Sequence, residues 1–298
     1  MKNNFFIKAA SVALCAFSLL LSSCESTRDD SDDTFSSMDA FYNTHRQEEQ
    51  EFIVDSVGKG PIVGKQNTRL YADTSLFMYP GGSDVKYPFT IKLIELYTHS
   101  DFVEYPMSTV AGGVMTESAG AIRVRAFKDG VELVLKPNKS FVAVMTDTNN
   151  LLNGMQIFYG ANADTDVSWT QATDGSSVVT NASSYTLALH QMGWVNCAQL
   201  RPSLLGVAAI TFVAEGSGTE FIDVYLIAKN YFSVVKVKNL QSIALPLGEP
   251  VTVVAMAMDQ NKKYRLHSST LTVGFGITVT LDMKVVTEQD VLNTLSTL

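Results

Sequence analysis

Alternating apolar and polar residues mark most of this chain after residue 60. Every second residue is apolar across much of Tyr87–Tyr97 and again across Ala121–Phe127. This period of two predicts strands with one buried and one solvated face. Asp129-Gly130 follows the second run almost directly. An Asp-Gly pair between two such runs predicts a tight β-hairpin.

The last third of the chain carries the same pattern. Predicted strands there are Gly206–Ala214, Phe221–Ala228, Phe232–Val237, Val251–Met258 and Tyr264–Ser268, and Leu271–Met283 is expected to be a strand pair or one long bent strand. Short polar turns separate them, as in small antiparallel sandwiches. We therefore expect a mainly β fold of two consecutive β-sandwich modules, at residues 58–198 and 199–298. The second module would be immunoglobulin-like or carboxypeptidase-regulatory-like.

Two stretches have a helical period instead. Between Phe35 and Phe52, apolar residues recur every three or four positions, which predicts one amphipathic helix. Near the C-terminus, Thr287 is followed three residues later by Asp290 and then by apolar residues. This arrangement predicts a short terminal helix capped by Thr287.

The N-terminus has the layout of an export signal. Lys2 and Lys8 precede an apolar run from Ala9 to Leu21, which is too short to span about 30 Å of hydrocarbon. The following Leu21-Ser22-Ser23-Cys24 resembles a bacterial lipobox. This resemblance implies that residues 1–23 are a signal peptide and that Cys24 is lipidated, with palmitate among its acyl chains. Two or more acyl chains hold a protein on a membrane almost permanently.

Residues 24–57 are expected to form an acidic tether and the first helix. Glu25–Asp33 holds acidic and small polar residues and nothing apolar to bury. It resembles the acidic signal with which Bacteroidetes send lipoproteins to the outer face of the outer membrane. We therefore expect a lipid-anchored outer-membrane protein, on the cell surface or on the periplasmic face.

Several short segments follow one another in a specific order within the first module. They are Ile62-Val63-Gly64, Thr68-Arg69-Leu70, Ile94–Tyr97, Ala119–Ala126, Leu133–Lys139, Met155–Gly160, Trp169 and Gly193–Cys197. Together they resemble a ZU5-like β-sandwich domain that is common in Bacteroidetes lipoproteins. The stretch Met78–Ser83 departs from that pattern. The resemblance implies an architecture for residues 58–198 and assigns no activity.

Composition and charge narrow the possible partners. The 298-residue chain has a formal net charge of −8, and removal of Lys2 and Lys8 with the signal brings it to about −10. Since no basic stripe is present to neutralise phosphates, we expect no nucleic-acid partner. Cys15 leaves with the signal and Cys24 carries the lipid, so we expect Cys197 to be a buried, inert thiol.

Residues that could carry chemistry are scattered along the chain. The four histidines, which lack any metal-ligand spacing, are His45, His99, His190 and His267. We interpret them as structural or surface residues, and His99-Ser100-Asp101 as a solvated loop after a strand. The carboxylates that a hydrolase could use are Glu95, Asp101, Glu104 and Glu117. Nothing in their spacing pairs them as a glycosidase requires.

Two oxygen-rich loops and four aromatic residues complete the candidates. The loops, interpreted as polar turns rather than calcium sites, contain Asp147, Asn149, Asn150, Asn162, Asp164 and Asp166. The aromatic residues are Phe102, Tyr79, Tyr87 and Tyr105. They either pack in the core or at its rim, or stack on the sugar rings of a ligand. We therefore predict no catalytic residue, no metal site and no cofactor.

Two functions fit these observations. The first is a non-enzymatic binding, adhesion or scaffolding role in the cell envelope. Its partners would be the membrane, reached through the lipid on Cys24, and an envelope protein or a polysaccharide. The alternative is a carbohydrate- or peptide-acting hydrolase with a carboxylate site between the two modules. The anchor, the tether and the lack of a catalytic motif favour the first.

Overall fold

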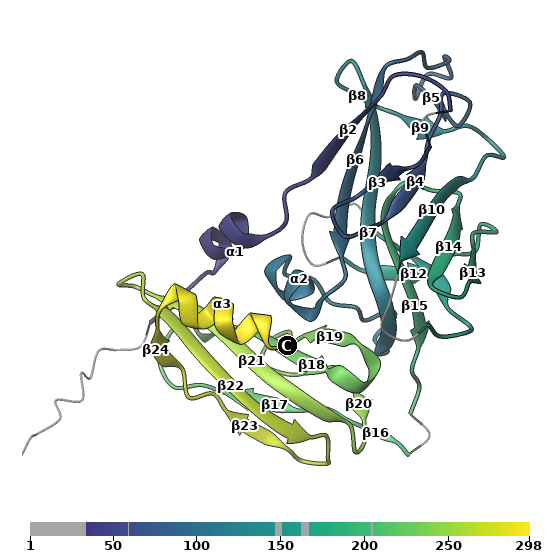
Figure 1. Cartoon of the computed structure of the whole chain (residues 1–298). Helices are drawn as coiled ribbons and strands as arrows, with labels where there is room; N and C mark the ends of the chain where they lie inside the picture. The colour runs from purple at the N-terminus through teal and green to yellow at the C-terminus, as the bar shows by residue number, and fades with distance from the viewer. Residues whose placement is uncertain (1–33, 59, 147–150, 162–166, 204) are drawn as a thin grey trace, which may run out of the picture. The chain divides into compact units, whose positions relative to one another are not determined.

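The structure, a computed structural model, describes residues 34–58, 60–146, 151–161, 167–203 and 205–298 (Figure 1). These residues form a mainly β fold of several antiparallel sheets with few short helices. The predicted fold class is thereby confirmed at that level. Within these ranges, no helix has the length and apolar character needed to cross a bilayer. Cys24 and the tether 25–33 lie outside the described residues.

The first β region consists of two facing sheets. One has the strand order β12-β11-β15-β7-β6-β2, with β8 paired to β7, and the other has the order β13-β14-β10-β4-β3. The strands of the first sheet are β2 Gln50–Val54, β6 Phe89–Leu96, β7 Thr116–Lys128, β8 Val131–Glu132, β11 Gln156–Gly160, β12 Trp169–Gln171 and β15 Gly193–Leu200. Those of the second are β3 Ile62–Val63, β4 Arg69–Tyr71, β10 Phe141–Thr146, β13 Ser177–Thr180 and β14 Ser184–Leu189. A short pair, β5 Phe77–Met78 and β9 Val134–Leu135, lies beside them.

The first core lies between these two sheets. Inward-facing residues of β10 and β14 alternate with more exposed ones, as a period of two requires. They meet inward-facing residues of the larger sheet, including Ile91, Val124 and Val195. Cys197 belongs to this core and is fully buried, which confirms the prediction of a buried thiol.

The second β region is built on one larger sheet of order β19-β18-β21-β22-β24. Its strands are β18 Asp223–Ala228, β19 Ser233–Lys236, β21 Pro250–Asp259, β22 Tyr264–Thr272 and β24 Lys284–Val286. Two small pairs complete it: β16 Val207–Ala208 with β20 Leu245–Pro246, and β17 Thr211–Val213 with β23 Thr278–Thr280. The short helices are η1 Thr219–Phe221, η2 Lys229–Tyr231 and α3 Glu288–Ser296. Thr287 and Asp290 cap α3 as predicted.

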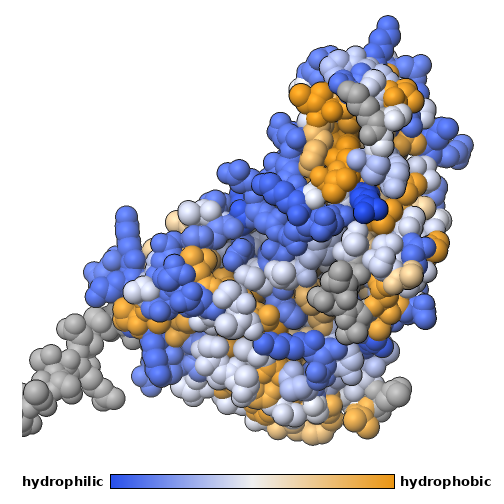
Figure 2. Space-filling model, viewed as in Figure 1, coloured by the Kyte–Doolittle hydropathy of each residue, from blue (hydrophilic) through white to orange (hydrophobic). Residues whose placement is uncertain are grey.

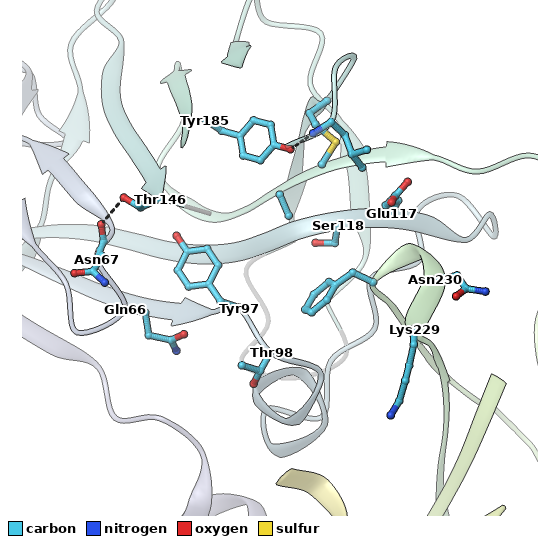
Figure 3. Close-up of a pocket in the computed structure, with 14 residues that line it drawn as sticks. Gln66, Asn67, Tyr97, Thr98, Glu117, Ser118, Thr146, Tyr185, Lys229 and Asn230 are labelled. Carbon is cyan, nitrogen blue, oxygen red and sulfur yellow. Dashed lines mark hydrogen bonds between the residues drawn. The ribbon is translucent and has the colours of Figure 1, made fainter. Parts of the chain in front are cut away.

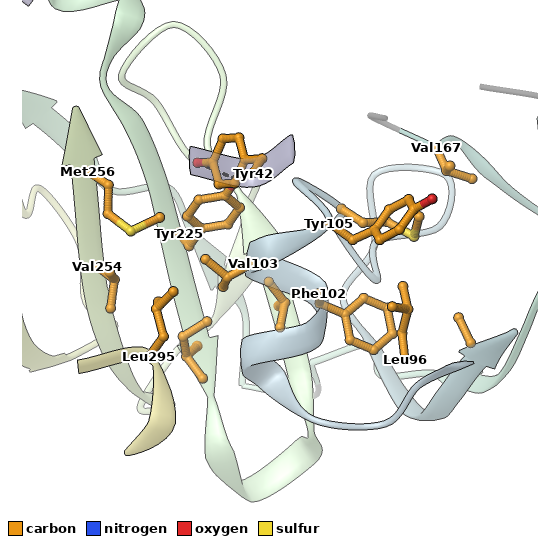
Figure 4. Close-up of a cluster of buried hydrophobic side chains, with 14 of the residues drawn as sticks. Tyr42, Leu96, Phe102, Val103, Tyr105, Val167, Tyr225, Val254, Met256 and Leu295 are labelled. Carbon is orange, nitrogen blue, oxygen red and sulfur yellow. Dashed lines mark hydrogen bonds between the residues drawn. The ribbon is translucent and has the colours of Figure 1, made fainter. Parts of the chain in front are cut away.

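A third cluster, the junction core, joins the two regions (Figure 4). Helix α2 (His99–Glu104) lies in its centre. Its Phe102 faces Leu96 of β6, whereas Val103 faces Tyr225 of β18 (Figure 4). Backbone hydrogen bonds reinforce this contact: Thr109 donates to the Val234 carbonyl at 2.8 Å. The described residues from Thr34 onward therefore form one compact unit.

The segment after the tether differs from its prediction. Instead of one helix over Phe35–Phe52, it forms β1 (Phe35–Ser36), α1 (Asp39–His45) and β2. The helical period holds only across α1, where Phe41 and Tyr42 are buried. Because β1 pairs with β21 and β2 pairs with β6, hydrogen bonding to distant strands overrides the local pattern at both ends.

Candidate functional site

A hollow of about 570 Å³ opens where the two β regions meet, and we call it the junction pocket (Figure 3). The first region contributes neutral polar side chains: Gln66, Asn67, Thr98, Ser118 and Thr146. It also contributes Tyr97, Glu117, Ala119, Leu152, Met155 and Tyr185. The second region supplies Lys229, Asn230 and Phe232. The volume of the junction pocket falls within the range of small-molecule sites.

The turn between β3 and β4 carries Asn67 and is held by a buried carboxylate. Glu95 accepts hydrogen bonds from the backbone N–H groups of Gln66 (3.0 Å) and Thr68 (3.0 Å) and from the Gln50 amide (2.8 Å). A Cβ on Gly64 would lie 2.5 Å from the Glu95 carboxylate, so the turn needs glycine there. Glu95 is therefore a structural residue that positions one wall of the junction pocket.

Tyr97 forms the adjacent wall. Its hydroxyl lies 2.7 Å from the Thr68 hydroxyl, within hydrogen-bond distance. Its ring packs directly over Gly120, where a Cβ would collide with it. Gly120 also has a φ of +116°, which L side chains rarely adopt. The Gly120 backbone thus leaves the space that the Tyr97 ring fills.

The wall from the second region is held against the first by Phe232. The Ser118 N–H donates to the Phe232 carbonyl at 3.2 Å, and the rings of Phe232 and His99 stack with centroids 4.3 Å apart. His99 is buried, and its Nε2 has no hydrogen-bond partner in the described part of the chain. Burial, together with the nearby Lys229 charge, lowers the pKa of His99 to about 4. At neutral pH its ring is therefore uncharged.

Two charged residues, Glu117 and Lys229, belong to the described lining of the junction pocket, and both are engaged by other groups. Arg201 donates to Glu117 Oε2 through both Nε and Nη2. The Lys229 ammonium donates to the Thr297 carbonyl at 3.0 Å. What faces the hollow is therefore mainly neutral: hydroxyl, amide, aromatic and aliphatic groups.

The remaining candidate carboxylates also have structural partners. Asp101 caps α2, accepting from the Tyr97 and Thr98 N–H groups, both at 2.9 Å. The interpretation of His99-Ser100-Asp101 as a solvated loop is therefore wrong, because these residues form the first turn of α2. Glu104 accepts from the Ser100 hydroxyl, and burial raises its pKa.

The other histidines lie apart from one another. His45 Nε2 is 2.8 Å from Glu288 Oε1, and His267 accepts a hydrogen bond from the Asp282 N–H. The backbone N–H of His190 donates to the Tyr159 hydroxyl. Among the described residues, no three His, Cys, Asp or Glu side chains gather as metal ligands.

Several sequence candidates receive no structural test. Cys24 lies outside the described residues, as do the loop residues Asp147, Asn149, Asn150, Asn162, Asp164 and Asp166. Of the aromatic candidates, Phe102 and Tyr105 are buried in the junction core, and Tyr79 and Tyr87 pack against the first core. Hydrophilic side chains gather on the surface over the connection from α1 to β2 (Figure 2).

A site between the two modules was expected only under the hydrolase alternative, with carboxylates lining it, and the residues that line the junction pocket were not predicted from the sequence. These residues come from separate segments between positions 66 and 232, and no motif links them. One local signal was available in the sequence: Gly64, just before the predicted strand from Thr68, indicates a turn, and Asn67 adopts a positive φ of 69° in that turn. No family model, no curated protein and no solved structure matches this chain.

Proposed function

We propose that this chain is a lipid-anchored protein of the bacterial outer membrane that binds a ligand in the junction pocket without transforming it. The observation that carries the proposal is the pocket itself, about 570 Å³ and lined by both β regions. Its lining combines apolar surface with a few placed polar groups, as ligand sites do. The lipobox-like Leu21–Cys24 supports the anchor.

The fold details belong to the same proposal. We interpret the first β region as a ZU5-like sandwich and the second as an immunoglobulin-like or carboxypeptidase-regulatory-like module. The chain enters the described structure through β1, which pairs with β21 of the second region. Tension on a lipidated Cys24 would therefore act on the second region first. Display on the cell surface and on the periplasmic face both accord with this arrangement.

The hydrolase alternative needs two carboxylates about 5 to 10 Å apart. The described residues that line the junction pocket include one, Glu117, and it is engaged by Arg201. No observation therefore favours a hydrolytic site in this pocket over a binding site.

The anchor and the pocket are tested separately. Cys24→Ser should leave an unprocessed precursor without fatty-acid label, and unchanged labelling would refute the anchor. For the pocket, affinity selection of sugars, peptides and fatty acids on the purified chain is compared with selection on Ala119→Trp, which fills the hollow. Compounds retained by the wild type should be lost from the variant. Retention of the same compounds by both proteins, or their conversion to products, would contradict a binding site here.

A further inference from the structure

Two amide side chains stand on opposite sides of the junction pocket (Figure 3). Asn67 comes from the turn between β3 and β4 in the first region, and Asn230 comes from η2 in the second. Both residues are exposed, and neither amide has a hydrogen-bond partner within the described ranges. Each can offer two N–H donors and one carbonyl acceptor to a ligand.

Apolar and aromatic surface lies between the two amides. Tyr97, Ala119 and Phe232 are half-buried, and Met155 and Tyr185 are buried below them. Such a surface suits the C–H face of a sugar ring, while the amides suit hydroxyl groups towards the two ends of a ligand that spans the hollow. A fatty acyl chain would leave the amides without partners, which costs free energy when water is displaced.

The charged residues around the hollow argue against ionic and phosphate-bearing ligands. Lys229 donates to Thr297 and Glu117 is engaged by Arg201, so neither is arranged to face an ion. Behind the pocket walls, Glu95 and Asp101 are saturated by backbone and amide donors. A phosphate-bearing ligand would need a basic cluster, which the described lining does not contain.

From these three observations we propose that the junction pocket takes a neutral saccharide. The ligand is an oligosaccharide that spans the hollow: one of its rings lies against the half-buried surface of Tyr97 and Phe232, and hydroxyl groups towards its two ends bond to Asn67 and to Asn230. The inference rests on the proposed function, because it names the ligand class of the same pocket. It also accounts for the contribution of both β regions, since each supplies one of the two amides.

The test uses the purified mature chain on an array that carries neutral oligosaccharides, uronic-acid oligosaccharides, peptides and fatty acids. The variant Asn67→Gly/Asn230→Ala removes both amides, and glycine keeps the positive φ at position 67. Asn239→Gly is the matched control, because Asn239 is also exposed, has a φ of 53° and lies outside the junction pocket. Asn230→Ala alone serves if the double variant does not fold.

A neutral oligosaccharide should bind the wild type and bind the double variant about tenfold more weakly, from the loss of two hydrogen bonds. The control should bind as the wild type does, and added salt should change affinity little. Absence of neutral saccharide binding, preference for uronic acids, or insensitivity to the double variant would overturn the inference. If peptide or fatty-acid binding depends on the pocket, only the saccharide class fails. If no binding depends on the pocket, the proposed function fails too.

Discussion

The first core and the junction core are both buried, but they use opposite faces of the same strands. In β15, Val195 and Cys197 point into the first core, whereas Trp194 and Ala198 point into the junction core. The same division occurs in β18, where Leu226 lies in the core of the second region and Tyr225 in the junction core. Apolar residues on both faces of a strand require covering layers on both sides.

The junction core is flanked by hydrogen bonds such as that from the Tyr42 hydroxyl to Asp223 Oδ2 at 2.8 Å. Another is that from the Trp169 Nε1–H to the Ser108 carbonyl at 2.6 Å. The two regions therefore share one buried interface, and the junction pocket, which Phe232 also lines, lies at its margin.

The largest effect on stability is expected when a large side chain of the junction core is replaced by alanine. Phe102 is fully buried there, and Phe141 is its matched counterpart in the first core. Each change to alanine should lower the free energy of unfolding by about 3–5 kcal/mol. Urea denaturation should show one transition, identical by tryptophan fluorescence and by circular dichroism. Separate transitions, or a cost below about 1 kcal/mol for Phe102→Ala, would show that the regions fold independently.

A pH effect should follow from His99. The folded chain protonates His99 near pH 4, whereas the unfolded chain protonates it near pH 6.5. The unfolded state therefore gains a proton first as pH falls, and stability decreases between about pH 6.5 and 4. The loss contributed by His99 should be about 3 kcal/mol.

His99→Phe keeps a ring on Phe232 and removes the proton site. Unfolding free energies of both proteins, measured from pH 8 to pH 4, should diverge as pH falls, with the variant losing less. Parallel curves would place His99 in a hydrated environment.

The third prediction concerns the turn that carries Asn67. Glu95→Gln replaces an acceptor that holds two backbone N–H groups and the Gln50 amide. The expected cost is about 2 kcal/mol. Glu51→Gln, on an exposed face of the same sheet, should cost under about 1 kcal/mol. If thermal unfolding shows the same loss of unfolding free energy for both variants, Glu95 does not position the turn.

The smallest effect should come from the cap of α3. Thr287→Ala removes the hydroxyl that accepts the Asp290 N–H, at a cost of about 1 kcal/mol. Because Leu295 of α3 packs in the junction core, fraying of this helix should loosen that core. Hydrogen exchange should increase in α3, while β10 should stay protected. Thr294→Ala, on the same helix, provides the matched control.

Local patterns predicted the parts of the fold that rest on local physics. The Asp129-Gly130 hairpin forms with positive φ at both residues, joining β7 to β8. The cap at Thr287 and the burial of Cys197 were also predicted correctly. The alternating runs across Tyr87–Tyr97 and Ala121–Phe127 became β6 and β7 because one face of each could be buried by its neighbours.

The errors and the omissions have a different origin. The single helix over Phe35–Phe52 failed because its two ends pair with strands more than 35 residues away. Helix α2 is only six residues long, too short for a clear period, although its capping box at Thr98 and Asp101 was a usable signal. The lining of the junction pocket could not be predicted, because no local rule places Asn67 and Asn230 on the same hollow.

The central claim is that the junction pocket binds a neutral saccharide, and methyl NMR tests it without altering the pocket. Among the 11 methionines of the chain, Met155 lines the pocket, whereas Met283 lies in the core of the second region. Addition of the neutral oligosaccharide selected on the array to the ¹³C-methyl-methionine-labelled mature chain should shift the Met155 signal and leave Met283 unchanged. Binding that leaves the Met155 signal in place would contradict the account.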